Sequence, residues 1–190
     1  LLALAERAEA AGVRIFENSR AFDVSEENSR CEVYTEHGTV FADNVVVATN
    51  YPIHDSGMFV AKLAPYRSYA MAVDAGRNMP DGMFISHEET PLRSFRRATF
   101  HDREVLIVGG EKHKVGQESN TAGCFSRLES WTRQNFDVKE LLYEWSTQDN
   151  WTPDRVPYIG LSPNRSNVYL ATGFGGWGMT TGFIAGRLIA

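Results

Sequence analysis

The amino-acid sequence predicts a mixed α+β fold, in which part of a parallel α/β layer is interrupted by an antiparallel, sheet-rich lobe. The near-continuous apolar run NVVVAT at 44–49 is typical of a strand that is covered on both faces. Three longer runs interleave polar and apolar residues, which predicts antiparallel strands with one open face, at 66–74, 93–100 and 104–110. A strand and a helix end the chain, at 168–171 and from Met179 onward.

The pattern of apolar and polar residues therefore divides the sequence into three segments. Residues 1–50 and 151–190 are assigned to the parallel layer, and residues 51–150 to the inserted lobe. The chain begins without Met on an amphipathic helix and stops within the pattern of another, so we expect it to be a piece of a longer protein.

Composition excludes several classes of protein. Of the 190 residues, 43% are hydrophobic and 23% charged, as in globular proteins with a sizeable core. A net charge of −5 without a basic stripe argues against a nucleic-acid partner. No apolar run approaches the ~20 residues that span a bilayer. Cys31 and Cys124 form no disulfide framework, which favours a reduced, cytoplasmic setting.

The first fifty residues read as a helix followed by short strands. The helix ends at Gly12, and strands are expected at 13–16 and 21–24. A hairpin is expected to join 31–35 to 39–41.

Between the inserted strands and the last strand we expect a hairpin turn, two helices and a connection. Asp102-Arg103 is the expected turn of a further hairpin, and helices are expected at 125–136 and 138–145. The segment 149–163 contains three prolines and is interpreted as a connection.

The stretch GFGGWG at 173–178 follows the last buried strand. Gly173, Gly175 and Gly178 match G-x-G-x-x-G, and amides at the start of the next helix would face a ligand. A dinucleotide fingerprint also needs a second strand and an acidic residue about 20 positions on. The chain ends first, so three readings stay open: a phosphate turn for a nicotinamide cofactor, another cofactor loop, or a glycine-rich bend.

Four landmarks in order carry a family resemblance: LLALAERAEAAGVRIFENSRAFDV, FADNVVVATNYP, TPDRVPYIG and NVYLATGFGGWGMTTG. Together they resemble the FAD-dependent oxidoreductases of the D-amino-acid oxidase superfamily, which includes glycine and sarcosine oxidases. The stretches IVGGEKHKVGQ and WSTQDNWTPDRVPYIG are most similar to members that often carry a Rieske iron–sulfur domain.

The resemblance implies an FAD-binding Rossmann-like domain whose main FAD fingerprint would precede Leu1. FAD would then belong to the longer protein, and residues 1–190 alone would bind it weakly or not at all. A [2Fe-2S] domain, where present, would follow Ala190, since no Rieske ligand set occurs here. The residues that the resemblance assigns to the cofactor are Ala21 at the adenine, Thr49, Asn50, and, at the flavin ring, Gly173, Gly175, Gly176, Trp177, Gly178, Met179 and Thr180.

The implied reaction is dehydrogenation of a C–N bond of an amine or amino-acid-like small molecule, by hydride transfer to flavin without an assigned catalytic base. Asp149 stands where the family's amino-acid oxidases carry a carboxylate-binding Arg; it either meets a cationic amine or is an ordinary surface residue. Other candidates for substrate binding are Arg67 and Tyr69, which alternation places on one face, and Arg93 with Arg96. No metal site is expected, because His87, His113 and Cys124 lack ligand spacing.

Two other functions remain open. A non-catalytic binding module would hold flavin that amines do not reduce. A nicotinamide-dependent dehydrogenase would need further sequence to complete the βαβ unit. Substrate identity, electron acceptor and oligomeric state are left undetermined by the sequence.

Overall fold

A computed structural model describes residues 1–54, 57–76, 79–86 and 91–190. The chain divides into two compact units. Unit 1 comprises residues 1–59, 158–172 and 184–190, and unit 2 comprises residues 60–157 and 173–183. Both contain helices and sheets, which confirms the predicted α+β class.

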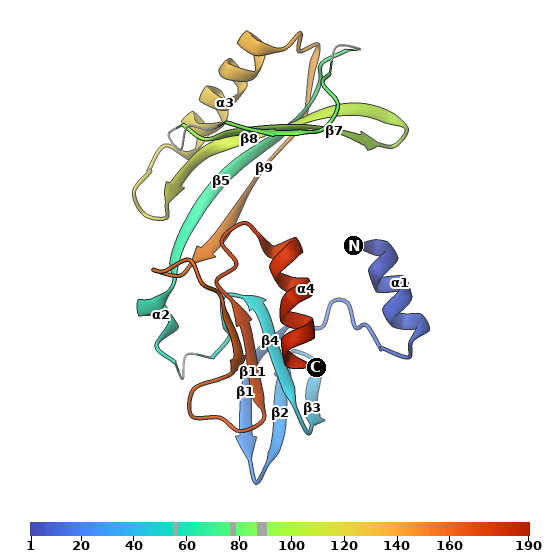
Figure 1. Ribbon diagram of the computed structural model, residues 1–190, viewed down its shortest axis with the longest axis vertical. Helices are drawn as coiled ribbons and strands as arrows, with labels where there is room; N and C mark the ends of the chain where they lie inside the picture. Colours follow the sequence, from blue (N-terminus) through green and yellow to red (C-terminus); the bar gives the residue numbers. More distant parts are fainter. Residues whose placement is uncertain (55–56, 77–78, 87–90) are drawn as a thin grey trace. The chain divides into compact units, whose positions relative to one another are not determined.

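Unit 1 contains a small mixed sheet and an antiparallel one (Figure 1). In the mixed sheet, β4 (Val45–Asn50) runs parallel to β11 (Val168–Thr172), and β10 (Tyr158–Leu161) pairs antiparallel with the other edge of β11. The predicted parallel pairing of the apolar run is thus confirmed. The second sheet is formed by β1 (Ala21–Glu27), β2 (Arg30–Thr35) and β3 (Gly38–Ala42), and it contains the predicted hairpin.

The start of the chain differs from the prediction in one element. Helix α1 (Leu2–Ala10) forms as expected, and Gly12 takes a left-handed φ of +92° just beyond it. The strand expected at 13–16 is wrong, because this segment pairs with no strand among the described residues and Phe16 is 68% exposed. Strand propensity without a partner does not produce a ladder.

Unit 2 is built on a five-stranded antiparallel sheet with the order β6-β7-β8-β5-β9. The short helix α2 (Phe59–Lys62) precedes it in the chain. Its strands are β5 (Ala64–Asp74), β6 (Met83–Ile85), β7 (Arg93–Phe100), β8 (Arg103–Lys114) and β9 (Glu140–Trp151). The three predicted strands are confirmed. The β7–β8 turn lies one residue earlier than expected, at His101-Asp102, where both φ angles are positive.

The helix predicted at 138–145 is wrong, because residues 140–145 belong to β9. The expected connection at 149–163 is shorter than predicted, since β9 continues to Trp151 and β10 lies within it. The spacing of Leu141, Leu142 and Trp145 fits a helix, but β9 pairs with β5 from Ala64↔Trp151 to Asp74↔Glu140. Long-range pairing along a strand of this length outweighs a weak local preference.

Helix α3 (Thr121–Asn135) covers one face of this sheet (Figure 1). The Asn120 side chain caps it by accepting a hydrogen bond from the Gly123 amide at 2.9 Å. Leu128 is fully buried beneath it. The core that it closes contains Tyr69, Met71, Val73, Ala75, Met79, Leu106, Val108, Cys124 and Leu128.

Helix α4 (Gly178–Ile189) follows the glycine stretch, as predicted. Within the described ranges, no helix is long and apolar enough to cross a membrane.

We predict that Leu128→Ala destabilises the protein by about 2–5 kcal/mol, because it leaves a cavity between α3 and the sheet. Urea denaturation measures the change. Gln134→Ala, at an exposed position of the same helix, is the control and should change stability by less than about 0.5 kcal/mol. Equal effects of the two substitutions would contradict the packing described here.

Candidate functional site

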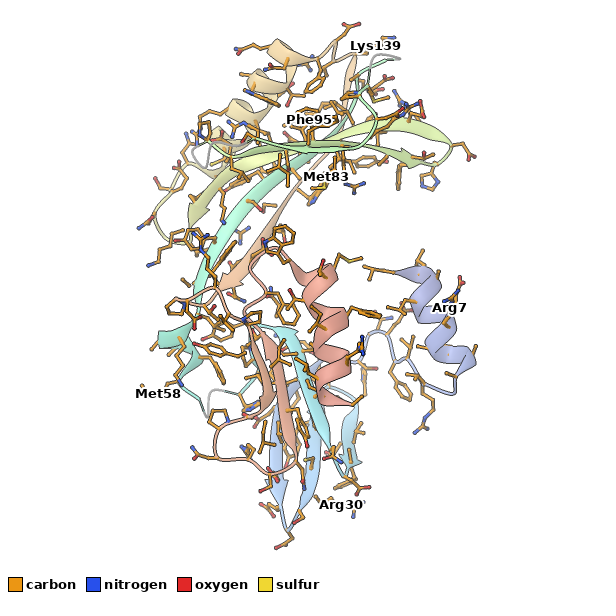
Figure 2. The ribbon with its side chains drawn as sticks, viewed as in Figure 1. Arg7, Arg30, Met58, Met83, Phe95 and Lys139 are labelled. Atoms are coloured by element: carbon orange, nitrogen blue, oxygen red, sulfur yellow. The ribbon has the colours of Figure 1, made fainter. Side chains whose placement is uncertain are left out.

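The sheet of unit 2 has two chemically different faces because successive strand residues point to opposite sides. On β5, Tyr69, Met71 and Val73 are buried in the core under α3. The residues that alternate with them, at 68, 70 and 72, are small. Met83 and Phe95 extend from opposite faces of the sheet (Figure 2). Phe95 packs against Trp131 and Phe136 on the helix side, and Met83 lines a cavity on the open side.

This cavity has a volume of about 460 Å³, within the range of small-molecule sites. We call it the loop cavity, because the glycine stretch forms part of its wall. Its walls are mostly apolar, with three charged residues among them: Arg96, Lys112 and Asp149. The glycine stretch contributes Gly175, Gly176 and Trp177.

The glycine stretch at 173–178, called the glycine loop below, packs against Trp151. Trp151 forms a β-bridge with Phe174, and the Gly175 amide donates a hydrogen bond to the Asn150 carbonyl at 3.1 Å. A Cβ added at Gly175 would lie 2.8 Å from Trp151 Cδ2, and Gly175 has a φ of +55°. Only glycine satisfies both conditions without strain, so the loop approaches the strand closely.

The first turn of α4 presents backbone donors. The Thr181 amide donates to the Trp177 carbonyl at 2.9 Å. The amides of Gly178, Met179 and Thr180 find no acceptor within the part of the chain that the structure describes. Such amides, with the helix dipole behind them, favour an electron-rich ligand.

Two buried polar atoms on the adjoining strand end also lack partners. Trp151 Nε1 and Thr152 Oγ1 have no hydrogen-bond partner among the described residues. Thr152 contacts the loop, since a Cβ at Gly173 would lie 2.7 Å from its Cγ2. Buried polar atoms are nearly always satisfied in proteins, so unsatisfied atoms here indicate a place for a ligand or water.

Asp149 lies next to the glycine loop, at the half-buried end of the loop cavity. A Cβ at Gly176 would be 3.7 Å from Asp149 Oδ2. Burial raises the pKa of Asp149, and the nearby positive charge of Lys112 acts in the opposite direction. Lys112 Nζ lies 3.9 Å from the centre of the Trp151 ring and 5.1 Å from that of Tyr66. Because burial disfavours the charged carboxylate, a cationic ligand beside it would stabilise its ionised form.

Arg67 and Tyr69 share a face, as alternation predicts, but that face carries α3. Tyr69 is 2% exposed and its ring packs edge-on against Phe125 at 4.9 Å. Its hydroxyl is hydrogen-bonded to His113 Nε2 at 3.0 Å, and burial raises its pKa. Arg67 donates to Ser146 Oγ at 2.8 Å. Tyr69 borders the loop cavity, whereas Arg67 is not among its lining residues.

Arg93 is engaged in a buried ion cluster on the same side as α3. Its guanidinium pairs with Glu111, which also accepts a hydrogen bond from Arg127 Nε at 2.6 Å. Arg93 further lies 5.8 Å from the Trp131 ring. These contacts join β7, β8 and α3, so Arg93 serves the packing of unit 2.

The remaining candidates of the sequence lie in unit 1. Ala21 begins β1 opposite Thr35. Thr49 and Asn50 end β4, where Asn50 takes a φ of +63° and pairs with Thr172 of β11. Asn50 O accepts a hydrogen bond from Thr172 Oγ1.

Several lining residues were not identified from the sequence. They are small or apolar residues of neighbouring strands, such as Ala70, Met83, Ile85 and Gly109. The alternation of large and small side chains along β5 is the signal that could have identified the open face. His87 lies outside the described residues. Across those described ranges, no group of three His, Cys, Asp or Glu residues could hold a metal ion.

Comparison with known proteins places these features in a family. A family model described as "FAD dependent oxidoreductase" (DAO) matches residues 1–190. Along its full length the chain is 30% identical to the Bacillus subtilis protein YhfW, whose name describes a Rieske 2Fe-2S iron-sulfur protein, and it covers 38% of that protein.

Solved structures share the fold. The glycine oxidase of Geobacillus kaustophilus superimposes with a TM-score of 0.72 at 21% identity, covering 98% of this chain and 51% of the oxidase. The iminodiacetate oxidase of Chelativorans sp. BNC1 gives a TM-score of 0.73 at 15% identity, covering 100% of this chain and 52% of the oxidase. The chain thus spans about half the length or less of these proteins. With the family model matched from end to end, the chain belongs to the DAO family of FAD-dependent oxidoreductases.

Proposed function

We propose that this chain supplies the substrate-binding sheet and the flavin-ring contacts of an enzyme that dehydrogenates a C–N bond of an amine or amino-acid-like substrate. The observation that carries the proposal is the position of Asp149. Its half-buried carboxylate lines the same cavity as the glycine loop and lies beside Gly176. A substrate amine held there would lie next to the loop that we assign to the cofactor.

The residues around the glycine loop fit a flavin ring. The amides of Gly178, Met179 and Thr180 have no acceptor among the residues that the structure describes, and they would offer donors to the oxygens and nitrogens of a pyrimidine edge. The glycine backbone at 175–176 allows a flat ring to approach without a Cβ in the way. Bound FAD would supply the acceptor for the hydride on the carbon next to the substrate nitrogen. The helix dipole behind the amides would stabilise the negative charge that this transfer brings.

Asp149 would bind and orient the substrate as its ammonium form. The nitrogen would then release one proton to solvent before the hydride leaves, because only a neutral amine has the lone pair that forms the C=N bond. An ammonium group donates charge-assisted hydrogen bonds to a carboxylate. The Lys112 ammonium lies over the rings of Trp151 and Tyr66. Without a bound amine, it is the positive charge that acts on Asp149. The wall around them is mostly apolar, so it offers few hydrogen-bonding partners to water near the bond that is broken.

The names of the similar structures support amine substrates. One is a glycine oxidase and one an iminodiacetate oxidase, and both names specify a molecule with nitrogen next to carbon–hydrogen bonds. A match to YhfW supports a [2Fe-2S] centre in the longer protein as the electron acceptor. The main FAD-binding fingerprint is likewise assigned to the longer protein.

We predict that the full-length protein carries FAD and that primary or secondary amines bleach its absorbance near 450 nm under anaerobic conditions. A panel of amines, amino acids and matched alcohols measures this by spectrophotometry. Flavin that is bound but reduced by no member of the panel would contradict the C–N assignment and favour a binding module.

We predict that Gly175→Ala lowers the FAD content of the purified full-length protein several-fold. The new Cβ meets the Trp151 ring at 2.8 Å on a backbone with positive φ, so the loop must move away from the strand. The control is Gly186→Ala, where the added Cβ contacts nothing within 4 Å. Equal FAD content in both variants, by absorbance after denaturation, would argue against a flavin contact by this loop.

We predict that Asp149→Asn weakens the binding of a cationic amine roughly ten- to a hundredfold, because a charge-assisted hydrogen bond contributes about 1.5–3 kcal/mol. Asp137→Asn, at an exposed position, is the control. In the wild type, amine affinity falls as the pH drops through the raised pKa of Asp149. Titrations across acidic pH should lack this decline in Asp149→Asn.

We predict that Asp149→Asn also changes the stability of the protein. A carboxyl group with a raised pKa in the folded state costs stability as the pH rises from its ordinary pKa through the raised one. Asp149→Asn removes this cost and should raise the melting temperature at neutral pH. A lower melting temperature would mean that Asp149 is held by interactions other than those described.

A further inference from the structure

We infer that the substrate of this site is an extended molecule that carries an anionic group and an apolar, ring-sized group besides the amine. The structure assigns the anionic group to Arg96, and the apolar group to a second cavity lined by Phe100, Tyr143 and Trp145. This inference rests on the proposed function of the loop cavity and specifies its substrate class.

The second cavity, which we call the hairpin cavity, lies on the same open face of the sheet. Its volume is about 540 Å³. Small residues, Ala72 and Ala98, leave space at its floor, and aromatic side chains form its walls. The Phe100 and Tyr143 rings meet edge-on at 5.5 Å, which fixes one wall.

The hairpin cavity presents more apolar surface than a solvated sheet face requires. Phe100 is 47% exposed, Tyr143 54% and Trp145 40%. Three neighbouring aromatic residues that remain this exposed around a hollow are typical of a binding surface. An apolar ring would bury parts of all three.

The two cavities adjoin each other, because Arg96 and Ile107 line both of them. Arg96 therefore stands at their junction. Met83 lies directly across from Arg96 on β6, so an apolar side chain flanks the guanidinium. A single molecule can pass from Asp149 to Trp145 along one face of the sheet.

Arg96 has no counter-charge within the described ranges of the chain. No described residue forms a hydrogen bond or an ion pair with it. Its neighbour Arg97, on the opposite face, pairs with both Asp81 and Glu104. Arg103 and Arg127 are likewise paired. Since none of the described residues pairs with it, the guanidinium fork of Arg96 can bind a carboxylate or a similar anion through two hydrogen bonds.

The spacing along β9 gives the length of the substrate. Asp149, Thr147, Trp145 and Tyr143 lie on one face at two-residue steps. At about 3.3 Å per residue, Asp149 and Trp145 are roughly 13 Å apart. An amine at Asp149 and an apolar group at Trp145 therefore belong to a molecule much longer than glycine. Arg96 disfavours a second cation at the junction, so the aromatic walls suit a neutral ring.

Three probes that flavin cannot dehydrogenate at a C–N bond test the inference on the full-length, FAD-loaded protein. They are 4-phenylbutanoate, which has both groups, butanoate, which lacks the ring, and 4-phenylbutan-1-ol, which lacks the carboxylate. Isothermal calorimetry should give the tightest binding for 4-phenylbutanoate. Arg96→Gln should weaken that binding about tenfold and leave the alcohol unchanged.

Two further variants complete the test. Trp145→Ala should weaken the binding of both phenyl probes and leave the affinity for butanoate unchanged. Arg97→Gln is the matched control on the opposite face and should change none of the three affinities. All variants are compared at equal FAD content and melting temperature.

Equal binding of 4-phenylbutanoate and butanoate would overturn the assignment of the hairpin cavity. An equal response to Arg96→Gln and Arg97→Gln would overturn the role of Arg96. Neither result depends on electron transfer, so these failures are distinct from a failure of amines to bleach the flavin, which concerns the proposed function.

Discussion

The packing of α3 against one face of β5 is the constraint on which the site of unit 2 depends. Tyr69, Met71 and Val73 project into that interface and are nearly fully buried. Since side chains alternate along a strand, burying this set turns residues 68, 70 and 72 to the other face. These are Ser and Ala, and their small size leaves the room in which both cavities form. The stability of the core and the space for a ligand thus have one origin.

The charged residues of unit 2 follow the same division. On the helix side, Arg93, Glu111 and Arg127 form a cluster in which each charge has a partner. On the open side, Asp149 is partly desolvated next to Lys112, and Arg96 has no counter-charge among the described residues. Paired charges stabilise the junction of helix and sheet, whereas Asp149 and Arg96 on the open side are placed to meet a ligand.

Most helices and strands could be predicted from the sequence. Which face of the unit 2 sheet is covered by a helix could not. The apolar run at β4 and the glycine stretch before α4 have strong local patterns, and both were predicted correctly. Segment 138–145 was not, because its apolar spacing fits a helix and only the long-range pairing with β5 makes it a strand. That pairing also brings Asp149 and Trp145 onto one face. Alternation correctly grouped Arg67 with Tyr69, but which face a helix covers depends on tertiary packing. The large residues at 69, 71 and 73 were the signal that the sequence offered.

The central claim is that the open face of the unit 2 sheet, next to the glycine loop, is where an amine meets the flavin. A crystal structure of the full-length, FAD-loaded protein with a slowly oxidised amine tests it most directly. The account predicts that the pyrimidine edge of the flavin contacts the amides of Gly178–Thr180, with the amine nitrogen within hydrogen-bond distance of the Asp149 carboxylate. A flavin ring or an amine bound away from this cavity, with Asp149 in contact with neither, would contradict it.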